Sequence, residues 1–298
     1  MPRAGRKPSA ARGGPRGGSR RPASTAPPGM VRLQRLMADA GVASRRRCEE
    51  MIEAGMVEVN GTIANRLPVF VNPRADKVVV DGRPLRAATG ERPADARKLY
   101  VMLYKPAGVV CSTRDQFERP TVVDLVKHPA GARLFPVGRL EFHASGLVLL
   151  TNDGDLTERL THARHGATRT YRVTVKGAID GAYAADLERG LNIKAARAAR
   201  EAGGRAGQIL VRVASRLAAG LKDERAQEKT VLEISVRAGK HRHLDDMLAE
   251  AGLRATRIEQ VGLGPLTLSG LAPGNWRELD RAELAALRRP FSDAEHGA

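Results

Sequence analysis

The sequence has few aromatic residues, two cysteines and no long apolar run, and each shortage argues against a class of protein. Ten aromatic residues among 298 (five Phe, four Tyr and one Trp) disfavour a surface that works mainly by stacking single-stranded bases. Cys48 and Cys111 lie far apart and form neither a disulfide framework nor a metal-ligand cluster, which fits a reducing cytoplasm. No run of about 18 apolar residues predicts a membrane-spanning helix, and residues 1–29 lack the apolar stretch of a secretory signal.

Basic residues are in large excess. There are 50 Lys and Arg residues against 33 Asp and Glu residues, which gives a net charge of +17. Residues 1–29 carry seven basic residues and no acidic one, so the remaining 269 residues still hold a charge of +10. A basic body favours a polyanionic partner. Nucleic acid fits better than a membrane surface, because the chain has no basic amphipathic helix and no lipidation motif.

Composition divides the chain into five segments. Residues 1–29, rich in Pro, Gly, Ala, Ser and Arg, predict a disordered basic tail, either a nonspecific extension or an element that steers the protein toward RNA. A compact module is expected at residues 31–86, a polar linker at 87–98, a larger domain at 99–288 and a second tail at 289–298.

The first module begins with a helical pattern. Leu33, Leu36, Met37 and Ala40 share one helical face, and Gly41 ends that helix.

A second helix and a hairpin follow. Ser44 is the expected N-cap of this helix, with Cys48, Met51 and Ile52 facing inward. Alternating residues around Asn60-Gly61 then predict a β-hairpin, and a further strand is expected at residues 78–80.

The region after residue 98 mixes short strands and helices, which predicts an α+β domain with a largely antiparallel sheet. Residues 195–206, rich in Ala, Arg and Gly, are interpreted as a surface insertion. The expected strands are Tyr100–Leu103, Gly108–Cys111, Leu147–Leu150, Tyr171–Val175, Gln208–Val213 and Val231–Val236. The expected helices are Leu156–Leu160, Ala182–Arg189 and Leu244–Ala251.

The first module resembles the S-four RNA-binding domain, named after the fourth small-subunit ribosomal protein. The resemblance rests on the segment RLQRLMADAGVASRRRCEEMIEAGMVEVNGTIA. Arg45, Arg46 and Arg47 occupy the first turn of the second helix, where guanidinium groups and free backbone N–H groups can both face phosphates. Three arginines there oppose the helix dipole, so RNA contact explains them better than an ordinary solvated basic face.

The larger domain resembles the ribosomal RNA pseudouridine synthases that carry an S-four domain. Six segments match in family order: LYKPAGVVCST, RPTVVDLV, RLFPVGRLEFHASGLVLLTNDGDLTERLTH, RTYRVTVKG, VLEISVRAGKHRHLDDML and VGLGPLTLSGLAPGNWREL. With the first module, the resemblance covers residues 31–288. It implies isomerisation of uridine to pseudouridine without a metal or a cofactor, and ribosomal RNA or a precursor ribosomal particle as partner. We expect a cytoplasmic monomer.

The resemblance assigns roles to several residues. A carboxylate beside the sugar acts as nucleophile or base, an arginine pairs with it, and an aromatic ring packs against the base. Glu141 stands in the carboxylate's position, Tyr171 matches the aromatic residue, and Arg242 matches the paired arginine. Arg139 matches a residue near the extruded nucleotide. Lys105-Pro106 matches an opening motif with a structural role.

Three positions depart from the family pattern. Glu141 replaces the family Asp and moves the carboxylate outward by roughly 1.5 Å, when a displacement of about 1 Å can cost on the order of 10²-fold in rate. Ala144 replaces a hydroxyl residue, which indicates a local network that has been rebuilt or abandoned. Asp245-Asp246 replaces a basic pair and should weaken RNA binding.

Other polar residues have a functional and a simpler interpretation. His143 is either an auxiliary acid or base on the face of Glu141, or a histidine that contacts solvent or RNA. His241 and His243 suggest a metal site together with His143, but no metal-ligand spacing supports one. Asp153-Gly154 is a turn signal.

Two further interpretations complete the list of candidates. Asp153 and Asp155 could be proposed as substitute carboxylates for catalysis, but the turn is the favoured interpretation. Trp276 is expected to pack at a core edge rather than to stack on a base.

The sequence supports two functions of different classes. The first is a pseudouridine synthase that uses Glu141. The second is a catalytically silent RNA-binding or ribosome-assembly factor that uses the same surface. Arg139, Tyr171 and Arg242 are all retained, and this favours the enzyme because a decaying pocket usually loses its partner residues too.

Overall fold

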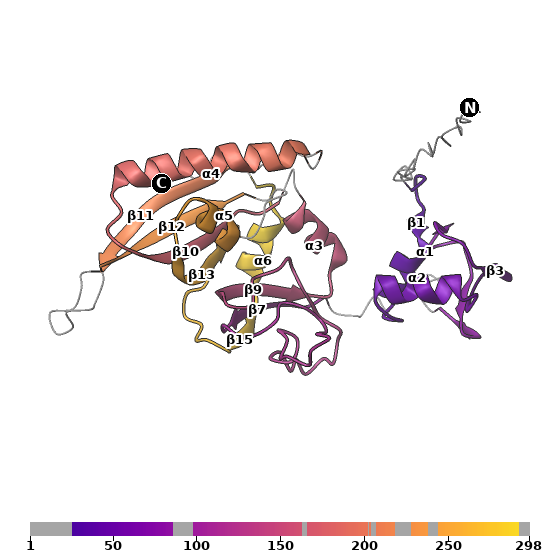
Figure 1. Cartoon of the computed structure of the whole chain (residues 1–298). Coiled ribbons are helices and arrows are strands. Elements are labelled where there is room, and N and C mark those ends of the chain that lie inside the picture. Colours follow the sequence, from indigo (N-terminus) through magenta and orange to yellow (C-terminus); the bar gives the residue numbers. More distant parts are fainter. Residues whose placement is uncertain are drawn as a thin grey trace, which may run out of the picture. The chain divides into compact units, whose positions relative to one another are not determined.

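The computed structural model describes residues 26–85, 98–162, 166–201, 203, 207–217, 228–237 and 244–291. Contacts within the chain divide it into two compact units, with the boundary between Ala94 and Asp95 (Figure 1). Most of the predicted basic tail, nearly all of the predicted linker and residues 292–298 lie outside the described residues. None of the described helices combines the length and apolar character needed to cross a bilayer.

The first unit combines two short helices with small sheets. Its strands pair in the orders β3-β2-β5-β6 and β1-β4. Its elements are β1 (Val31–Arg32), α1 (Leu33–Asp39), α2 (Arg45–Glu53), β2 (Val57–Val59), β3 (Thr62–Ala64), β4 (Phe70–Val71), β5 (Val78–Val80) and β6 (Arg83–Pro84).

The local signals of the first unit act as predicted. The Ser44 side chain accepts a hydrogen bond from the backbone N–H of Arg47 at 3.2 Å and caps α2. Asn60 and Gly61 both have positive φ, as a two-residue β2–β3 hairpin requires. Leu33 is buried as expected, but Ala40 is exposed, because α1 ends at Asp39 and Ala40 is its C-cap.

The second unit is built on one twisted sheet. Nine strands of the described residues pair in the order β11-β12-β10-β13-β9-β7-β15, with β14 beside β13 and β8 beside β9. Among the described strands only β13 and β9 pair in parallel, so the predicted α+β class with a largely antiparallel sheet is confirmed. The strands are β7 (Tyr100–Lys105), β8 (Phe135–Pro136), β9 (Ser145–Thr151), β10 (Arg169–Lys176), β11 (Ile209–Leu217), β12 (Lys229–Val236), β13 (Ala255–Leu263), β14 (Leu266–Thr267) and β15 (Trp276–Glu278).

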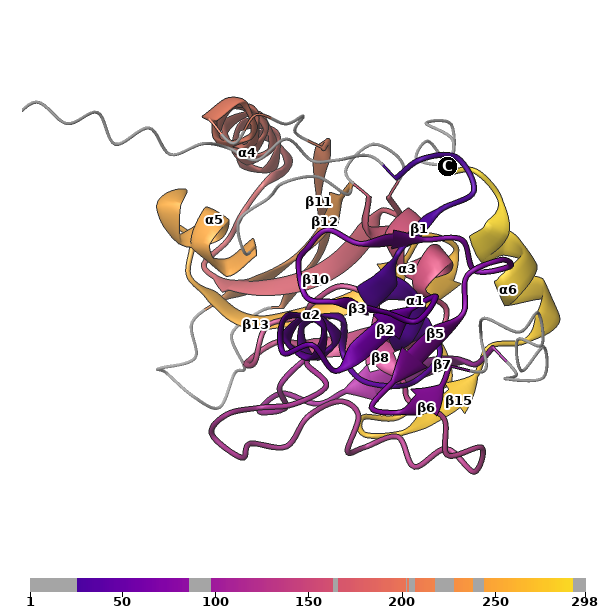
Figure 2. The same ribbon diagram turned by 90° about the vertical axis from the view of Figure 1, so that its right-hand side faces the viewer.

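Helices cover both faces of this sheet because its strands alternate between two hydrophobic cores. The helices are α3 (Gly154–Thr161), α4 (Gly181–Glu201), α5 (Leu244–Glu250) and α6 (Arg281–Arg288). Val101 and Leu103 of β7 share a core with α4 and α5, whereas Met102 of the same strand shares a second core with α3 and α6. Figure 2 shows α4 and α5 on one side of the unit and α6 on the other.

Three sequence predictions in this unit are wrong: the strand at residues 108–111, the surface insertion at residues 195–206 and the turn at Asp153-Gly154. The expected strand Gly108–Cys111 has only an isolated bridge, between Val110 and Thr121, because Gly108 turns the chain with a φ of +79°. The expected insertion begins as helix: α4 continues to Glu201, with Ala195 and Ala199 buried. They follow Leu191 at steps of four residues, so the Ala-rich composition reflected one helical face.

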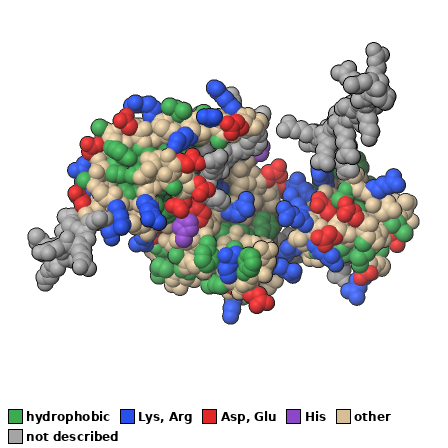
Figure 3. Space-filling model, in the orientation of Figure 1, with side chains coloured by type: hydrophobic (Ala, Val, Ile, Leu, Met, Phe, Trp, Pro, Cys, Tyr) green, Lys and Arg blue, Asp and Glu red, His purple; other side chains and the backbone are tan. Residues whose placement is uncertain are grey.

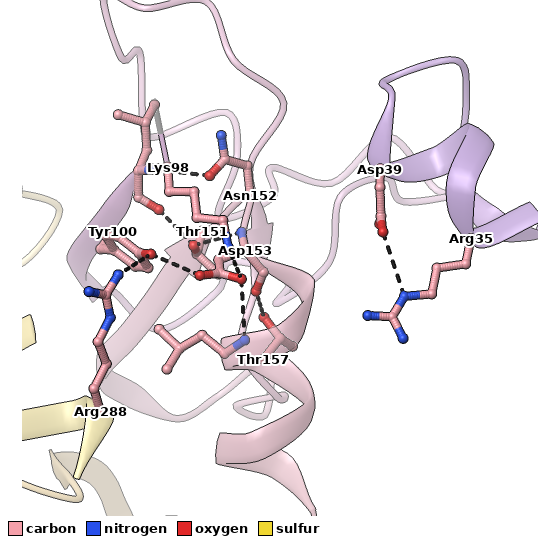
Figure 4. Close-up of polar contacts among 11 residues, drawn as sticks. Arg35, Asp39, Lys98, Tyr100, Thr151, Asn152, Asp153, Thr157 and Arg288 are labelled. Atoms are coloured by element: carbon pink, nitrogen blue, oxygen red, sulfur yellow. Dashed lines mark hydrogen bonds and ion pairs between the residues drawn. The ribbon is translucent and has the colours of Figure 1, made fainter. Parts of the chain in front are cut away.

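Asp153 begins a helix rather than closing a turn, and this removes it from the candidate catalytic groups. Its side chain accepts from Tyr100 Oη at 2.8 Å, from Lys98 Nζ at 2.9 Å and from the backbone of Leu156 (Figure 4). Although burial acts to raise it, the hydrogen bonds from Lys98 and Tyr100 hold the pKa of Asp153 below its usual value.

Asp153 also lies at the wrong end of the sheet for catalysis with Glu141. It follows the last residue of β9, whereas Glu141 precedes the first. Seven residues of strand separate the two ends by roughly 20 Å.

We expect Gly146→Ala to destabilise the second unit. Gly146 has a φ of +122°, and a Cβ there would lie 2.2 Å from the carbonyl oxygen of Gln260 on β13. The backbone strain alone should lower the free energy of unfolding by at least about 1 kcal/mol, and the overlap should add to that. Urea denaturation provides the measurement. Gly190→Ala on α4 is the matched control, because a Cβ there meets nothing within 4 Å. Equal stability of Gly146→Ala and the parent would contradict the expectation.

Candidate active site

The candidate carboxylate lies on a short loop between β8 and β9. Gly138, near the start of the loop, has a φ of +83°, and a Cβ there would lie 2.7 Å from a guanidinium nitrogen of Arg169. Glycine therefore lets the Arg169 side chain lie against the loop backbone. Arg139 is exposed, Leu140 is buried, and the Glu141 side chain is only 15% exposed. The loop thus presents one charge to solvent and shields the other.

A buried lysine fixes the backbone of this loop. Lys105 is fully buried at the end of β7, and its Nζ donates to the carbonyl oxygens of Pro106 (2.9 Å), Phe142 (3.3 Å) and Ala144 (2.6 Å). Phe142 also accepts from the backbone N–H of Gly108 at 2.8 Å. Burial lowers the pKa of Lys105 to about 8, and the nearby Cys111 opposes this shift. The structural role expected for Lys105-Pro106 therefore consists of these hydrogen bonds to the loop backbone.

Glu141 faces a histidine that also contacts an acidic helix residue. His143 Nε2 lies 3.3 Å from Glu141 Oε2 and 3.4 Å from Asp245 Oδ2. Asp245 occupies the first turn of α5, so one imidazole joins the loop to that helix. Ala144 is fully buried in the hydrophobic core, where a hydroxyl would need a polar partner. The sequence departures indicated a local network that has been rebuilt or abandoned, and these are the contacts found at that place.

Tyr171 and Arg169 lie on the same face of β10, two residues apart. Burial raises the pKa of Tyr171 to about 12; the positive charge of Arg169 opposes the rise, and the negative charge of Glu141 adds to it. Both charges therefore lie near the Tyr171 hydroxyl. The phenol stays protonated at neutral pH, so Tyr171 can pack against a base or donate a hydrogen bond but does not act as a base itself.

Comparison with known proteins identifies the family of the chain. Residues 99–250 match the family described as RNA pseudouridylate synthase, and residues 31–72 match the S4 domain, which is the S-four domain of the sequence prediction. The chain belongs to the RNA pseudouridine synthase family. Both predicted modules are confirmed as matches to these families.

Relatives and a solved structure agree with this family. An uncharacterized RNA pseudouridine synthase of Aquifex aeolicus is 33% identical over 259 residues, which cover 86% of this chain and 93% of the relative. Ribosomal large subunit pseudouridine synthase B of Bacillus subtilis is 32% identical over 268 residues, covering 90% and 98%. A crystal structure of a pseudouridylate synthase, 23% identical, shares the fold with a TM-score of 0.54 and covers 86% of this chain and 99% of its own.

The structure brings together only part of the predicted site. The negative charge of Glu141 contributes to the raised pKa of Tyr171, and Arg139 lies on the same loop as Glu141. Arg242, His241 and His243 lie outside the described residues.

Metal ligation and the remaining tryptophan can be judged only within the described residues. There, no group of three or more His, Cys, Asp or Glu side chains could hold a metal ion. Trp276 is partly buried against the core of the synthase domain, as expected.

Three functional features were not predicted from the sequence. The first is Arg169 beside the site, for which the sequence did hold a signal: Arg169 stands two residues before Tyr171, where a strand is predicted to start, and therefore shares its face. The contact of His143 with Asp245 joins segments about a hundred residues apart, and no local pattern indicates it. The same holds for the bonds from Lys105 to the loop carbonyls, since nothing in its own strand marks a buried cation.

The S4 unit carries the predicted phosphate-binding arginines on its surface. Arg45, Arg46 and Arg47 are all exposed in the first turn of α2. Arg47 donates to Glu50 at 2.7 Å, an exposed pair that contributes little to stability.

Changing all three arginines to Ala should weaken RNA binding and reduce its dependence on salt. The slope of log affinity against log salt should fall by roughly one for each phosphate contact removed. Filter binding across a salt series tests this. A variant with Arg189, Arg197 and Arg200 of α4 changed to Ala removes the same exposed charge elsewhere and should bind nearly as the parent does. If both variants lost the same RNA affinity, the effect would come from the net charge of the protein and not from the position of the arginines on α2.

Lys105→Met should change how stability depends on pH. The proton leaves Lys105 near pH 8 in the folded state but near 10.5 in the unfolded state. Between these values the unfolded state holds more protons, so stability rises with pH for the parent. From pH 8 to 10.5, the parent should gain up to roughly 3 kcal/mol in free energy of unfolding relative to the Met variant. Urea denaturation over this range measures the difference, and a constant difference would contradict it.

Proposed function

We propose that this chain isomerises a uridine of large-subunit ribosomal RNA to pseudouridine, with Glu141 as the catalytic carboxylate. The observation that carries the proposal is the ordered surroundings of Glu141: a shielded carboxylate near His143 and Tyr171, on a loop held by Lys105. The RNA class comes from two relatives, of Bacillus subtilis and Shigella flexneri, each named ribosomal large subunit pseudouridine synthase B.

The proposed chemistry needs a carboxylate but no external reactant. The N1–C1′ bond of the uridine breaks, the base turns, and a C5–C1′ bond forms. The proton on C5 leaves to solvent, and N1 gains a proton. Glu141 would attack the sugar or remove a proton from it, while the neutral Tyr171 packs against the base. The positive charge of Arg169, near the same hydroxyl, would keep the surroundings favourable for an ionised carboxylate.

Binding is proposed to begin at the S4 domain. Its exposed arginines on α2 would hold the RNA through phosphates, and the synthase domain would then extrude the target nucleotide. The exposed Arg139 on the Glu141 loop would contact the extruded nucleotide. Arg242 would pair with the carboxylate, as the family resemblance implies.

The second candidate is an RNA-binding protein without catalysis. The extra methylene of Glu141 and the acidic Asp245 favour it, because both differ from the family pattern at the site. Against it stands the contact of Glu141 with His143, which gives the longer side chain a partner of its own. This contact supports a pocket adapted to glutamate rather than one that has lost its chemistry.

Glu141→Asp and Glu141→Gln test the proposal. If the pocket is adapted to glutamate, the shorter Asp withdraws from His143, and the rate should fall by about 10²-fold. Glu141→Gln removes the charge and should abolish activity. The assay is tritium release from 5-tritiated uridine in large-subunit ribosomal RNA transcripts and precursor particles, with RNA affinity measured in parallel. Affinity should change little in either variant, so a loss of rate then reports chemistry.

Each other outcome has a definite meaning. A faster Glu141→Asp variant would show that the extra methylene of Glu141 places its carboxylate too far out for catalysis. Activity that survives Glu141→Gln would remove Glu141 from the chemistry. No pseudouridine with the parent on any ribosomal RNA, together with retained RNA binding, would favour the silent binder.

A further inference from the structure

Two phenylalanines of the synthase domain are exposed although the chain has few aromatic residues. Phe117 is 67% exposed and Phe142 is 45% exposed. Both rings face one cation: the guanidinium carbon of Arg119 lies 5.2 Å from each ring centroid. Phe142 directly follows Glu141. Phe117, Arg119 and Phe142, here called the aromatic cluster, therefore adjoin the candidate active site.

The loop that carries two members of this cluster is held in place. Asp115 accepts two hydrogen bonds from the Arg119 side chain, at 3.0 and 2.7 Å, and further ones from the backbone N–H groups of Phe117 and Arg119. Glu118, between them, has a φ of +56°, which few non-glycine residues adopt. The bidentate pair engages the edge of the guanidinium group and leaves its flat surface to the rings.

The third member is fixed independently. The carbonyl oxygen of Phe142 accepts from Gly108 N–H and from Lys105 Nζ, so the ring projects from the same restrained loop as Glu141. Burying the two rings would add hydrophobic stabilisation to the fold. The cation–π contact with Arg119 therefore does not by itself explain why both rings stay exposed. In Figure 3, hydrophobic and basic side chains adjoin on the lower edge of the larger unit, where Figure 1 places the loops between β7 and β9.

We propose that the aromatic cluster is a stacking subsite for an unpaired nucleobase of the RNA, next to the target uridine. The inference rests on the proposed function and deepens it. Extruding a nucleotide breaks its stacking with its neighbours, and an exposed ring beside the pocket replaces that contact. Every base has a π-face, so the subsite holds a base of any sequence, and Arg119 adds charge suited to polyanionic RNA. Both the charge and the continuity with Glu141 favour RNA as the occupant.

The test compares a double Phe117→Ala, Phe142→Ala variant with the parent. The probe is a large-subunit ribosomal RNA transcript, and affinity is measured by filter binding over a salt series. Affinity should fall about tenfold or more, because base–aromatic stacking is lost. The salt slope should stay unchanged, because no charge is removed. Tyr183→Ala on α4, an aromatic residue with the same 45% exposure as Phe142, is the matched control and should leave affinity unchanged.

A second pair of variants separates stacking from apolar contact. Changing both phenylalanines to Tyr keeps the rings and should keep affinity, whereas changing both to Leu keeps apolar bulk and should lose it. Leu variants that bind like the parent would overturn the proposal. Unchanged affinity of the double Ala variant for naked RNA would also overturn the proposal. If that variant lost only its activity on precursor particles, the cluster would contact a protein rather than a base.

Folding and activity are read separately from binding. A lowered melting temperature of the double Ala variant, with affinity restored by Leu, would make the cluster structural and overturn the proposal. If the parent forms no pseudouridine but the double Ala variant still loses affinity with an unchanged salt slope, the stacking subsite stands while the proposed function fails. A parent that binds no RNA would overturn both.

Discussion

The site depends on the hydrogen bonds that the buried ammonium group of Lys105 donates to backbone carbonyl oxygens. Lys105 stands at the end of β7 and binds the carbonyls of Phe142 and Ala144, which flank the exposed His143. A loop with this many polar backbone groups cannot rest on a hydrophobic sheet end unless its carbonyls find donors. Lys105 provides them, and Glu141 therefore projects from a backbone whose position is set by the sheet. Burial removes the Lys105 ammonium group from solvent, which disfavours its charged form and lowers its pKa.

Local signals predicted much of the fold because the features concerned are themselves local. Ser44 caps α2 and Asn60-Gly61 turns the hairpin through hydrogen bonds and φ values that depend on a few neighbouring residues. The capping box of Asp280 and Glu283 at α6 was equally visible, yet this helix was not predicted. The parallel contact of β13 with β9 was beyond prediction, because it depends on Gly146 letting Gln260 approach across more than a hundred residues of chain.

The candidate site was predictable as a set of residues but not as an arrangement. Glu141, Arg139 and Tyr171 could be named from the family resemblance alone, and the structure places Glu141 near the Tyr171 hydroxyl. What each group contacts depends on the meeting of separate elements. His143 is the clearest case, since it had an auxiliary role or none in the sequence, and its position between Glu141 and Asp245 appears only when α5 packs beside the β9 loop.

The departures of this chain from the family pattern are best understood together. A longer carboxylate at residue 141 and an acidic residue at 245 would each be unfavourable alone, one through position and the other through repulsion of RNA. His143 Nε2 lies within 3.4 Å of a carboxylate oxygen of each acid, so the imidazole in its protonated form offsets part of both negative charges. Arg139 lies on the same loop as Glu141, and the Arg169 guanidinium lies against Gly138 of that loop, so both add positive charge beside it. A site that gains acidic groups can therefore still attract a polyanion, provided that these cations remain.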